Sequence, residues 1–210
     1  MYNKQKAIDD YKDCAEAISN GTVDIPNKHC KAEKKLFLAS KAFSAGGIIA
    51  AATINQSRPD LFQAMTLINP FLDVLGTMSM MTKGDGREES EHFLTDHEWD
   101  EFGNPISDTQ ACSTITQYCP IFNIKKGQSY PPMFIVSTVD DENVPYSNGK
   151  QYVNKIRASM KETRDDIPIL LNIEAMGGHH LHGRILDVSI LKNCFLLGQL
   201  HCTRKNMNLM

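Results

Sequence analysis

Apolar side chains recur along this chain with two spacings, one typical of helices and one typical of buried strands. Residues 4–19 place apolar side chains on one face at helical spacing, and Asn20-Gly21 follows them, which predicts a helix that ends there. Short runs that are apolar throughout predict four buried strands, at residues 35–43, 64–70, 132–138 and 167–175. Further helices are expected at residues 46–56, 146–161 and 184–200.

This alternation of strands and helices predicts an α/β fold, in which a parallel sheet carries helices on both faces. A flavodoxin-like binding domain would show the same alternation, but the first predicted strand has no glycine-rich phosphate loop. Residues 78–110 are charged, rich in methionine and punctuated by glycine and proline. They predict an insertion or lid above the sheet, where loops commonly face substrate.

Composition and charge narrow the class of protein. The chain has 210 residues, of which 41% are hydrophobic and 22% charged, so we expect one domain over residues 1–210. The formal net charge is −3 and the basic residues are scattered, which argues against a nucleic-acid partner. No stretch reaches the roughly 20 apolar residues of a membrane span, and the first residues lack an apolar signal core, so we expect a cytoplasmic protein.

The sequence Ala42-Phe43-Ser44-Ala45-Gly46 lies between the first predicted strand and the helix after it. It is similar to the nucleophile elbow G-x-S-x-G, in which small residues allow a tight strand-to-helix turn that exposes the serine hydroxyl. Here alanine replaces the first glycine. Small residues also gather where a strand and a helix pack closely, so this motif alone leaves both interpretations open.

Acidic and histidine residues follow later strands in the order that such a nucleophile needs. Asp140 and Asp141 come directly after the third predicted strand, and His179, His180 and His182 come after the fourth. A serine hydroxyl becomes nucleophilic when an imidazole accepts its proton and a carboxylate orients that imidazole.

Each of these residues also has an alternative interpretation. The paired aspartates would serve equally well to cap a turn, and Asp73 after the second strand is another candidate for the acid. We expect no metal, because no carboxylate or cysteine accompanies the histidines at ligand spacing. We expect no cofactor either.

Several segments together resemble the catalytic domain of the prolyl oligopeptidase family, most closely its prolyl endopeptidase-like branch. The resemblance extends from the first helix through the histidine loop, and the sequence after about Leu196 matches poorly. The segments that carry it are AFSAGG, RPDLFQAMTLINPFLDVLGTM, EFGNP, YCPIFNIK, DENVP and GGHH.

The resemblance implies an α/β-hydrolase fold and assigns roles to single residues. Ser44 is similar to the family's nucleophile, the Ala45 backbone N–H to an oxyanion donor, and Asp141 to the acid. For the histidine, the pattern Gly-Gly-x-His of the endopeptidase-like branch selects His180, whereas the pattern Gly-His of the peptidases selects His179. We expect His180 to be the base and keep His179 as the alternative.

Departures from the family pattern bear on the substrate. The true prolyl peptidases have asparagine after the serine and, two residues after the acid, an arginine that grips the substrate; here those places hold Ala45 and Asn143. We therefore expect short peptides, esters or thioesters rather than strict cleavage after proline. Phe43, Trp99 and Asn143 are candidates to face substrate, although Trp99 would serve equally well as a buried aromatic residue of the lid.

The family's sheet has eight strands, with the elbow after the fifth, and an N-terminal β-propeller covers the site. The resemblance thus implies that this chain holds the C-terminal half of the sheet, without the first four strands and the propeller. The elbow strand would then be an apolar edge. The alternative function is a weak or inactive hydrolase-fold interaction protein that keeps the elbow for packing.

Overall fold

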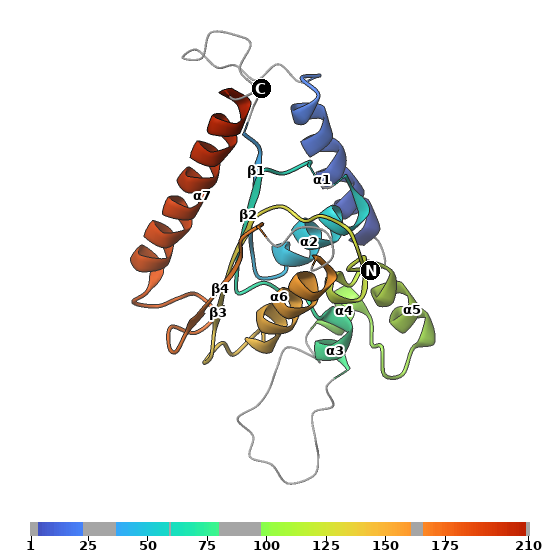
Figure 1. Ribbon diagram of the computed structural model, residues 1–210. Coiled ribbons are helices and arrows are strands. Elements are labelled where there is room, and N and C mark those ends of the chain that lie inside the picture. The colour runs from blue at the N-terminus through green and yellow to red at the C-terminus, as the bar shows by residue number, and fades with distance from the viewer. Residues whose placement is uncertain (1–3, 23–36, 59, 80–97, 161–165, 209–210) are drawn as a thin grey trace.

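The computed structural model describes residues 4–22, 37–58, 60–79, 98–160 and 166–208 (Figure 1). In this part of the chain, four parallel strands form one sheet in the order β1-β2-β3-β4. They are β1 (Ala39–Phe43), β2 (Ala64–Ile68), β3 (Met133–Thr138) and β4 (Ile169–Glu174). Because all four run the same way, their carboxyl ends lie along one edge of the sheet.

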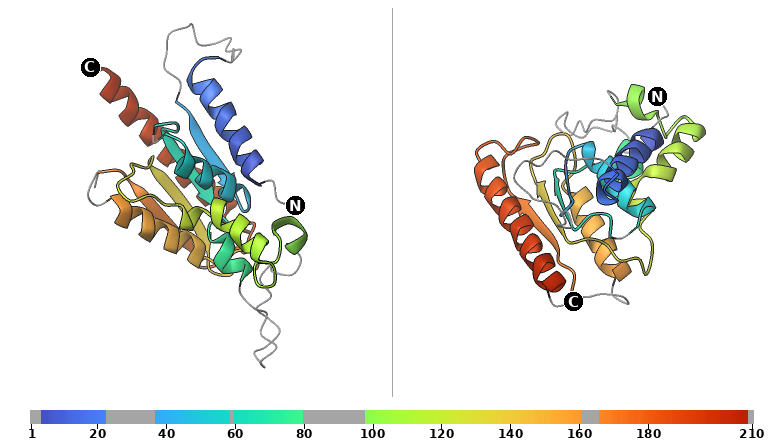
Figure 2. Two further views of the ribbon diagram at one scale, coloured as in Figure 1. Left: turned by 90° about the vertical axis from the view of Figure 1, so that its right-hand side faces the viewer. Right: turned by 90° about the horizontal axis from the view of Figure 1, so that it is seen from above.

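Helices cover both faces of this sheet (Figures 1 and 2). Three of them, α1 (Lys4–Ser19), α2 (Gly46–Gln56) and α6 (Ser147–Met160), pack on one face, and α7 (Ile185–Asn208) lies on the other. The main core lies between the sheet and the first three helices, and a smaller core around Phe134, Val136 and Phe195 lies under α7. The predicted parallel sheet with helices on both faces is confirmed.

Burial explains the hydrophobic pattern of the strands. All six residues of β3 are buried because both of its faces and both of its edges are covered, and its sequence is correspondingly apolar or small throughout. The outer strand β4 leaves Leu170 and Ile173 exposed. The other outer strand in the described part of the chain is β1, the predicted edge, which begins at Ala39.

The connection between β2 and β3 contains short helices. These are α3 (Val74–Met78), α4 (Trp99–Phe102), α5 (Thr109–Tyr118) and the 3₁₀ helix η1 (Pro120–Phe122). Residues 80–97 of the predicted insertion 78–110 lie outside the described residues, as do Met80 and Met81. The end of the insertion forms α4, where Phe102 is buried against Phe71 and Trp99 packs against the main core.

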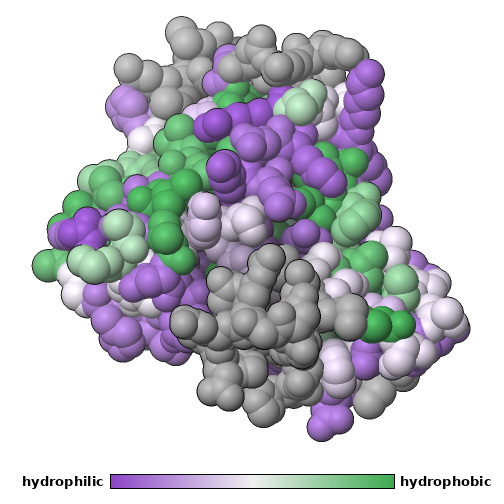
Figure 3. Space-filling model, turned by 90° about the horizontal axis from the view of Figure 1, so that it is seen from below, coloured by the Kyte–Doolittle hydropathy of each residue, from purple (hydrophilic) through white to green (hydrophobic). Residues whose placement is uncertain are grey.

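Helix α7 is longer than predicted, because it continues to Asn208 instead of ending near residue 200. Apolar side chains lie on all sides of it, and Figure 3 shows apolar residues on this side of the molecule. Leu186 is 72% exposed, and Ile185, Ile190, Leu191 and Leu197 are exposed as well. No helix within the described ranges is both long enough and apolar enough to cross a membrane.

Candidate active site

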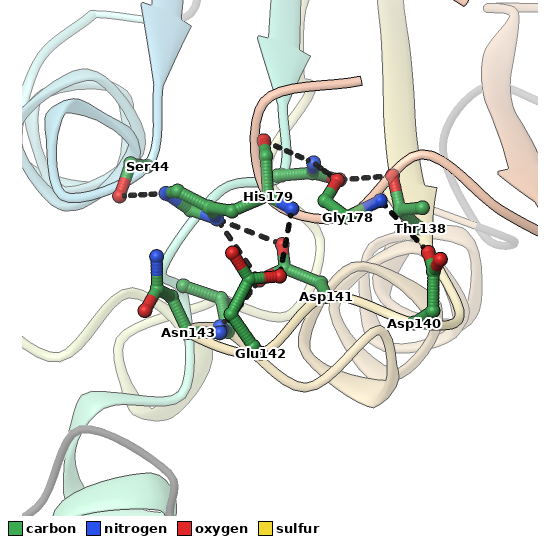
Figure 4. Close-up of polar contacts among 10 residues, drawn as sticks. Ser44, Thr138, Asp140, Asp141, Glu142, Asn143, Gly178 and His179 are labelled. Atoms are coloured by element: carbon green, nitrogen blue, oxygen red, sulfur yellow. Dashed lines mark hydrogen bonds and ion pairs between the residues drawn. The ribbon is translucent and has the colours of Figure 1, made fainter. Parts of the chain in front are cut away.

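Three side chains from the carboxyl ends of three strands meet at one edge of the sheet (Figure 4). Ser44 follows β1, Asp141 lies in the loop after β3, and His179 lies in the loop after β4. The parallel order of the strands brings these loops together, although they lie far apart in the sequence.

Ser44 lies in a tight turn between β1 and α2. Its φ of 51° is in the left-handed region, which few non-glycine residues adopt. The Ser44 N–H donates to the Ile68 carbonyl at 3.1 Å, and the Ser44 carbonyl accepts from the N–H groups of Gly47 at 2.8 Å and Phe71 at 3.0 Å. The turn is therefore held by backbone hydrogen bonds on both sides and presents the hydroxyl above the sheet.

The glycines of this turn have different tolerances. A methyl group at position 47 would lie 2.7 Å from Pro70 Cβ, which is too close, so only glycine fits there. A methyl group at position 46 would lie 3.7 Å from Ala42 Cβ, an ordinary contact. The elbow thus accepts alanine at position 42, where the motif usually has glycine, because this approach leaves room for a methyl group.

His179 joins the serine to the acid. Its Nε2 lies 2.8 Å from Ser44 Oγ, and its Nδ1 lies 2.9 and 3.0 Å from the two carboxylate oxygens of Asp141. A carboxylate can only accept, so Nδ1 carries the proton and Nε2 is free to accept the hydroxyl proton of Ser44. His179 is 4% exposed and Asp141 is 5% exposed, so both of these side chains are almost completely buried.

Asp141 is itself fixed by the turn in which it lies. Its Oδ1 accepts hydrogen bonds from the N–H groups of Asn143 at 2.8 Å and Val144 at 2.9 Å. The carboxylate therefore both caps this turn and orients the imidazole. The alternative acid Asp73 instead caps α3, where its Oδ1 accepts from the Gly76 N–H at 3.0 Å.

Comparison with known proteins agrees with this geometry. The model of the prolyl oligopeptidase family matches residues 2–186. The chain belongs to this family. It is similar to prolyl endopeptidase-like proteins of Gallus gallus, with 35% identity over 84% of this chain and 22% of the relative, and of Homo sapiens, with 39% identity over 66% and 18%.

Solved structures of this family have the same fold. Oligopeptidase B from Leishmania major is 28% identical and superposes with a TM-score of 0.70, over 90% of this chain and 23% of that one. The sheet and helices of this chain match the catalytic α/β-hydrolase domain of these peptidases. The chain spans about a fifth of the length of the curated relatives that it matches.

The predicted choice of histidine in this family member is wrong. His179, not His180, contacts Ser44 and Asp141, whereas His180 is exposed and its ring lies 5.6 Å from that of Phe43. Gly177 and Gly178, with φ values of 135° and 60°, form a turn from which the ring of the first histidine reaches Ser44 and Asp141. The sequence pattern Gly-Gly-x-His does not reveal this turn, and so it does not show which histidine reaches the serine.

The acids on either side of Asp141 hold the histidine loop of this site. Asp140 accepts from the N–H groups of Gly178 at 2.9 Å and Gly177 at 3.2 Å, and Glu142 accepts from the His179 N–H at 3.2 Å (Figure 4). The hydrogen bond from Gly178 is the main reason that the pKa of the exposed Asp140 is lowered. The sequence analysis did not single out Glu142; three acids in a row after a strand are the signal for it.

The remaining candidates lie at different distances from this chemistry. Phe43 is 41% exposed and its ring lies 4.8 Å from that of His179, so it borders the site. Ala45 lies between Ser44 and the start of α2, and Asn143 is half-buried in the turn of the acid. Trp99 packs against the main core. Among the described residues, no group of three His, Cys, Asp or Glu side chains is arranged to hold a metal ion.

Proposed function

We propose that this chain is a serine hydrolase, a serine-type peptidase or esterase that transfers acyl groups from short peptides or esters to water. The observation that carries the proposal is the hydrogen-bonded line from Ser44 through His179 to Asp141. Membership of the prolyl oligopeptidase family supports the same chemistry. Small peptides, esters or thioesters would be its substrates. The cytoplasmic location of the protein stays a prediction.

The geometry supplies a role for each side chain. Ser44 Oγ would attack the substrate carbonyl while His179 Nε2 takes its proton, and Asp141 would stabilise the imidazolium that forms. The imidazolium would then return this proton to the leaving group, and water would repeat the cycle on the acyl-enzyme. The Ala45 N–H, at the positive end of α2, would donate a hydrogen bond to the oxyanion.

The preference for small substrates rests on residues beside the site. Asn143 provides no positive charge with which to clamp a substrate backbone, in contrast to an arginine at that place. The exposed ring of Phe43 borders the histidine and offers an apolar surface to an acyl or leaving group.

Hydrolysis of a p-nitrophenyl ester by the 210-residue chain tests this proposal. We expect hydrolysis that Ser44→Ala abolishes and that Ser57→Ala, at the other end of the same helix, leaves unchanged. Equal rates for the wild type and Ser44→Ala, with folding intact in both, would contradict the proposal and favour a hydrolase-fold interaction protein.

A further inference from the structure

Asn69, the first residue after β2, connects this strand to the histidine loop. The side chain is buried, with 2% of its surface exposed. Its Nδ2 donates to the His179 carbonyl at 2.8 Å and lies 3.3 Å from the Gly178 carbonyl, and its Oδ1 accepts from Thr138 Oγ1 at 3.1 Å. The amide thus links the ends of β2 and β3 to the loop that carries the imidazole.

The backbone of Asn69 is held in an unusual conformation. Its φ is 39°, in the left-handed region, while its N–H continues the sheet by donating to the Val136 carbonyl at 2.8 Å. Asparagine tolerates this region better than most residues, yet the conformation still costs free energy. In this conformation Asn69 ends β2, and its side chain points toward the histidine loop.

The histidine loop needs this kind of support. Gly177 and Gly178 have positive φ values and lack side chains, so the unconstrained loop would have many conformations available. Asp140 and Glu142 hold its N–H groups, and Asn69 holds its carbonyl groups. Together, the two sets of contacts hold both the N–H groups and the carbonyl groups of the peptide units around His179.

We propose that Asn69 is a positioning residue that fixes the main chain of His179 so that Nε2 stays within hydrogen-bonding distance of Ser44. The proposal rests on the proposed function, in which His179 is the base. Thr138 supports Asn69, because its hydroxyl fixes the orientation in which the amide presents its N–H groups to the loop.

Asn69→Ala removes the tether, and Asn55→Ala is its matched control. Asn55 is 1% exposed and its Nδ2 donates to the Pro120 carbonyl at 2.9 Å, so its loss deletes a similar buried bond near the C-terminal end of α2, away from Ser44. We expect Asn69→Ala to lower kcat for an ester substrate by about 10- to 100-fold with KM within about threefold, because a small displacement of a catalytic group has effects of this size. Asn55→Ala should leave both constants near the wild-type values.

Hydrogen exchange of the loop amides provides a second readout that does not depend on activity. Exchange in residues 175–184 should become faster in Asn69→Ala and stay at the wild-type rate in Asn55→Ala, since only the first change releases the loop. If the wild type hydrolyses no ester, the proposed function fails, and this comparison still decides whether Asn69 holds the loop.

A milder variant covers the case in which Asn69→Ala does not fold. Thr138→Val keeps the shape of the side chain but removes the hydroxyl that orients the amide, so it should give a smaller fall in kcat and a smaller rise in loop exchange. Loop exchange and kcat equal to those of the wild type in a folded Asn69→Ala or Thr138→Val protein, or changes no larger than in Asn55→Ala, would overturn the proposal.

Discussion

Asp141 performs two tasks at once, since its carboxylate accepts from two backbone N–H groups and from the imidazole of His179. From the sequence, capping a turn and orienting the histidine were alternative roles for the aspartate pair. In the structure the two roles are not alternatives. Asp140 reaches across to the histidine loop, and Asp141 both caps its turn and binds the ring. A short carboxylate at the start of a turn can do both because its two oxygens point in different directions.

Asp141→Asn should lower kcat for an ester by about 10⁴-fold, the size seen when the corresponding acid of a serine protease is changed, because the amide favours the wrong tautomer of the imidazole. Asp73→Asn is the control, since Asp73 caps α3 and asparagine is also a good cap. Steady-state kinetics with both variants checks this. A larger fall in Asp73→Asn than in Asp141→Asn would show that the acid is misassigned.

The lowered pKa of Asp140 makes a prediction about pH. A carboxylate with a pKa lower in the folded than in the unfolded protein stabilises the fold above its unfolded pKa, and this contribution is lost as the pH falls through the folded pKa. Exchange of the Gly177 and Gly178 amides should therefore be faster in Asp140→Asn than in the wild type at neutral pH. The difference should disappear in acid. The exposed Asp60→Asn is the control, and a difference that persists in strong acid would contradict this explanation.

At the scale of elements, the turn from β1 into α2 agrees well with what its sequence predicted. The small residues around Ser44 predicted a strand, a tight turn and a helix, and the structure has all three, with α2 at residues Gly46–Gln56 as expected. Periodicity predicted the order and type of the strands and of the long helices, because each has a distinct pattern of burial. Short helices such as α3 and α4 have too few residues to show a period, so the sequence did not predict them.

Gly47→Ala and Gly46→Ala form a matched pair that tests the packing of this turn. The methyl group at position 47 would collide with Pro70, so we expect the free energy of unfolding to fall by about 1–3 kcal/mol. At position 46 the methyl group has room, and alanine in the first turn of the helix should raise the free energy of unfolding by up to about 1 kcal/mol. Urea denaturation measures both, and equal effects would contradict this assignment of close packing.

The choice of histidine marks the limit of what the sequence predicts about the site. Strand order and chain order placed the serine, the acid and a histidine pair at one edge of the sheet. The choice within the pair depends on the φ values of Gly177 and Gly178 and on contacts from Asn69 and Glu142, which come from distant parts of the chain. No local pattern encodes such contacts.

At the scale of the whole molecule, apolar surface remains exposed on α7. Leu186 and Ile190 are exposed and belong to a set of apolar side chains on this helix. Patches of this kind promote association. We expect the isolated chain to associate as its concentration rises and Leu186→Glu with Ile190→Glu to reduce this, as measured by light scattering. Lys41→Gln with Lys150→Gln, at exposed positions, is the control because it lowers the net charge by the same amount; if it reduced association equally, net charge rather than the apolar surface would be responsible.

The proposed chemistry depends on the contact of His179 with Ser44. Labelling by a fluorophosphonate probe tests this contact most directly. The measurement is the rate and the position of the adduct, found by mass spectrometry, in the wild type, His179→Ala and His180→Ala. We predict an adduct on Ser44, formed at least about 100-fold more slowly in His179→Ala and within about threefold of the wild-type rate in His180→Ala. An adduct on another serine, or equal rates in the wild type and His179→Ala, would contradict the account.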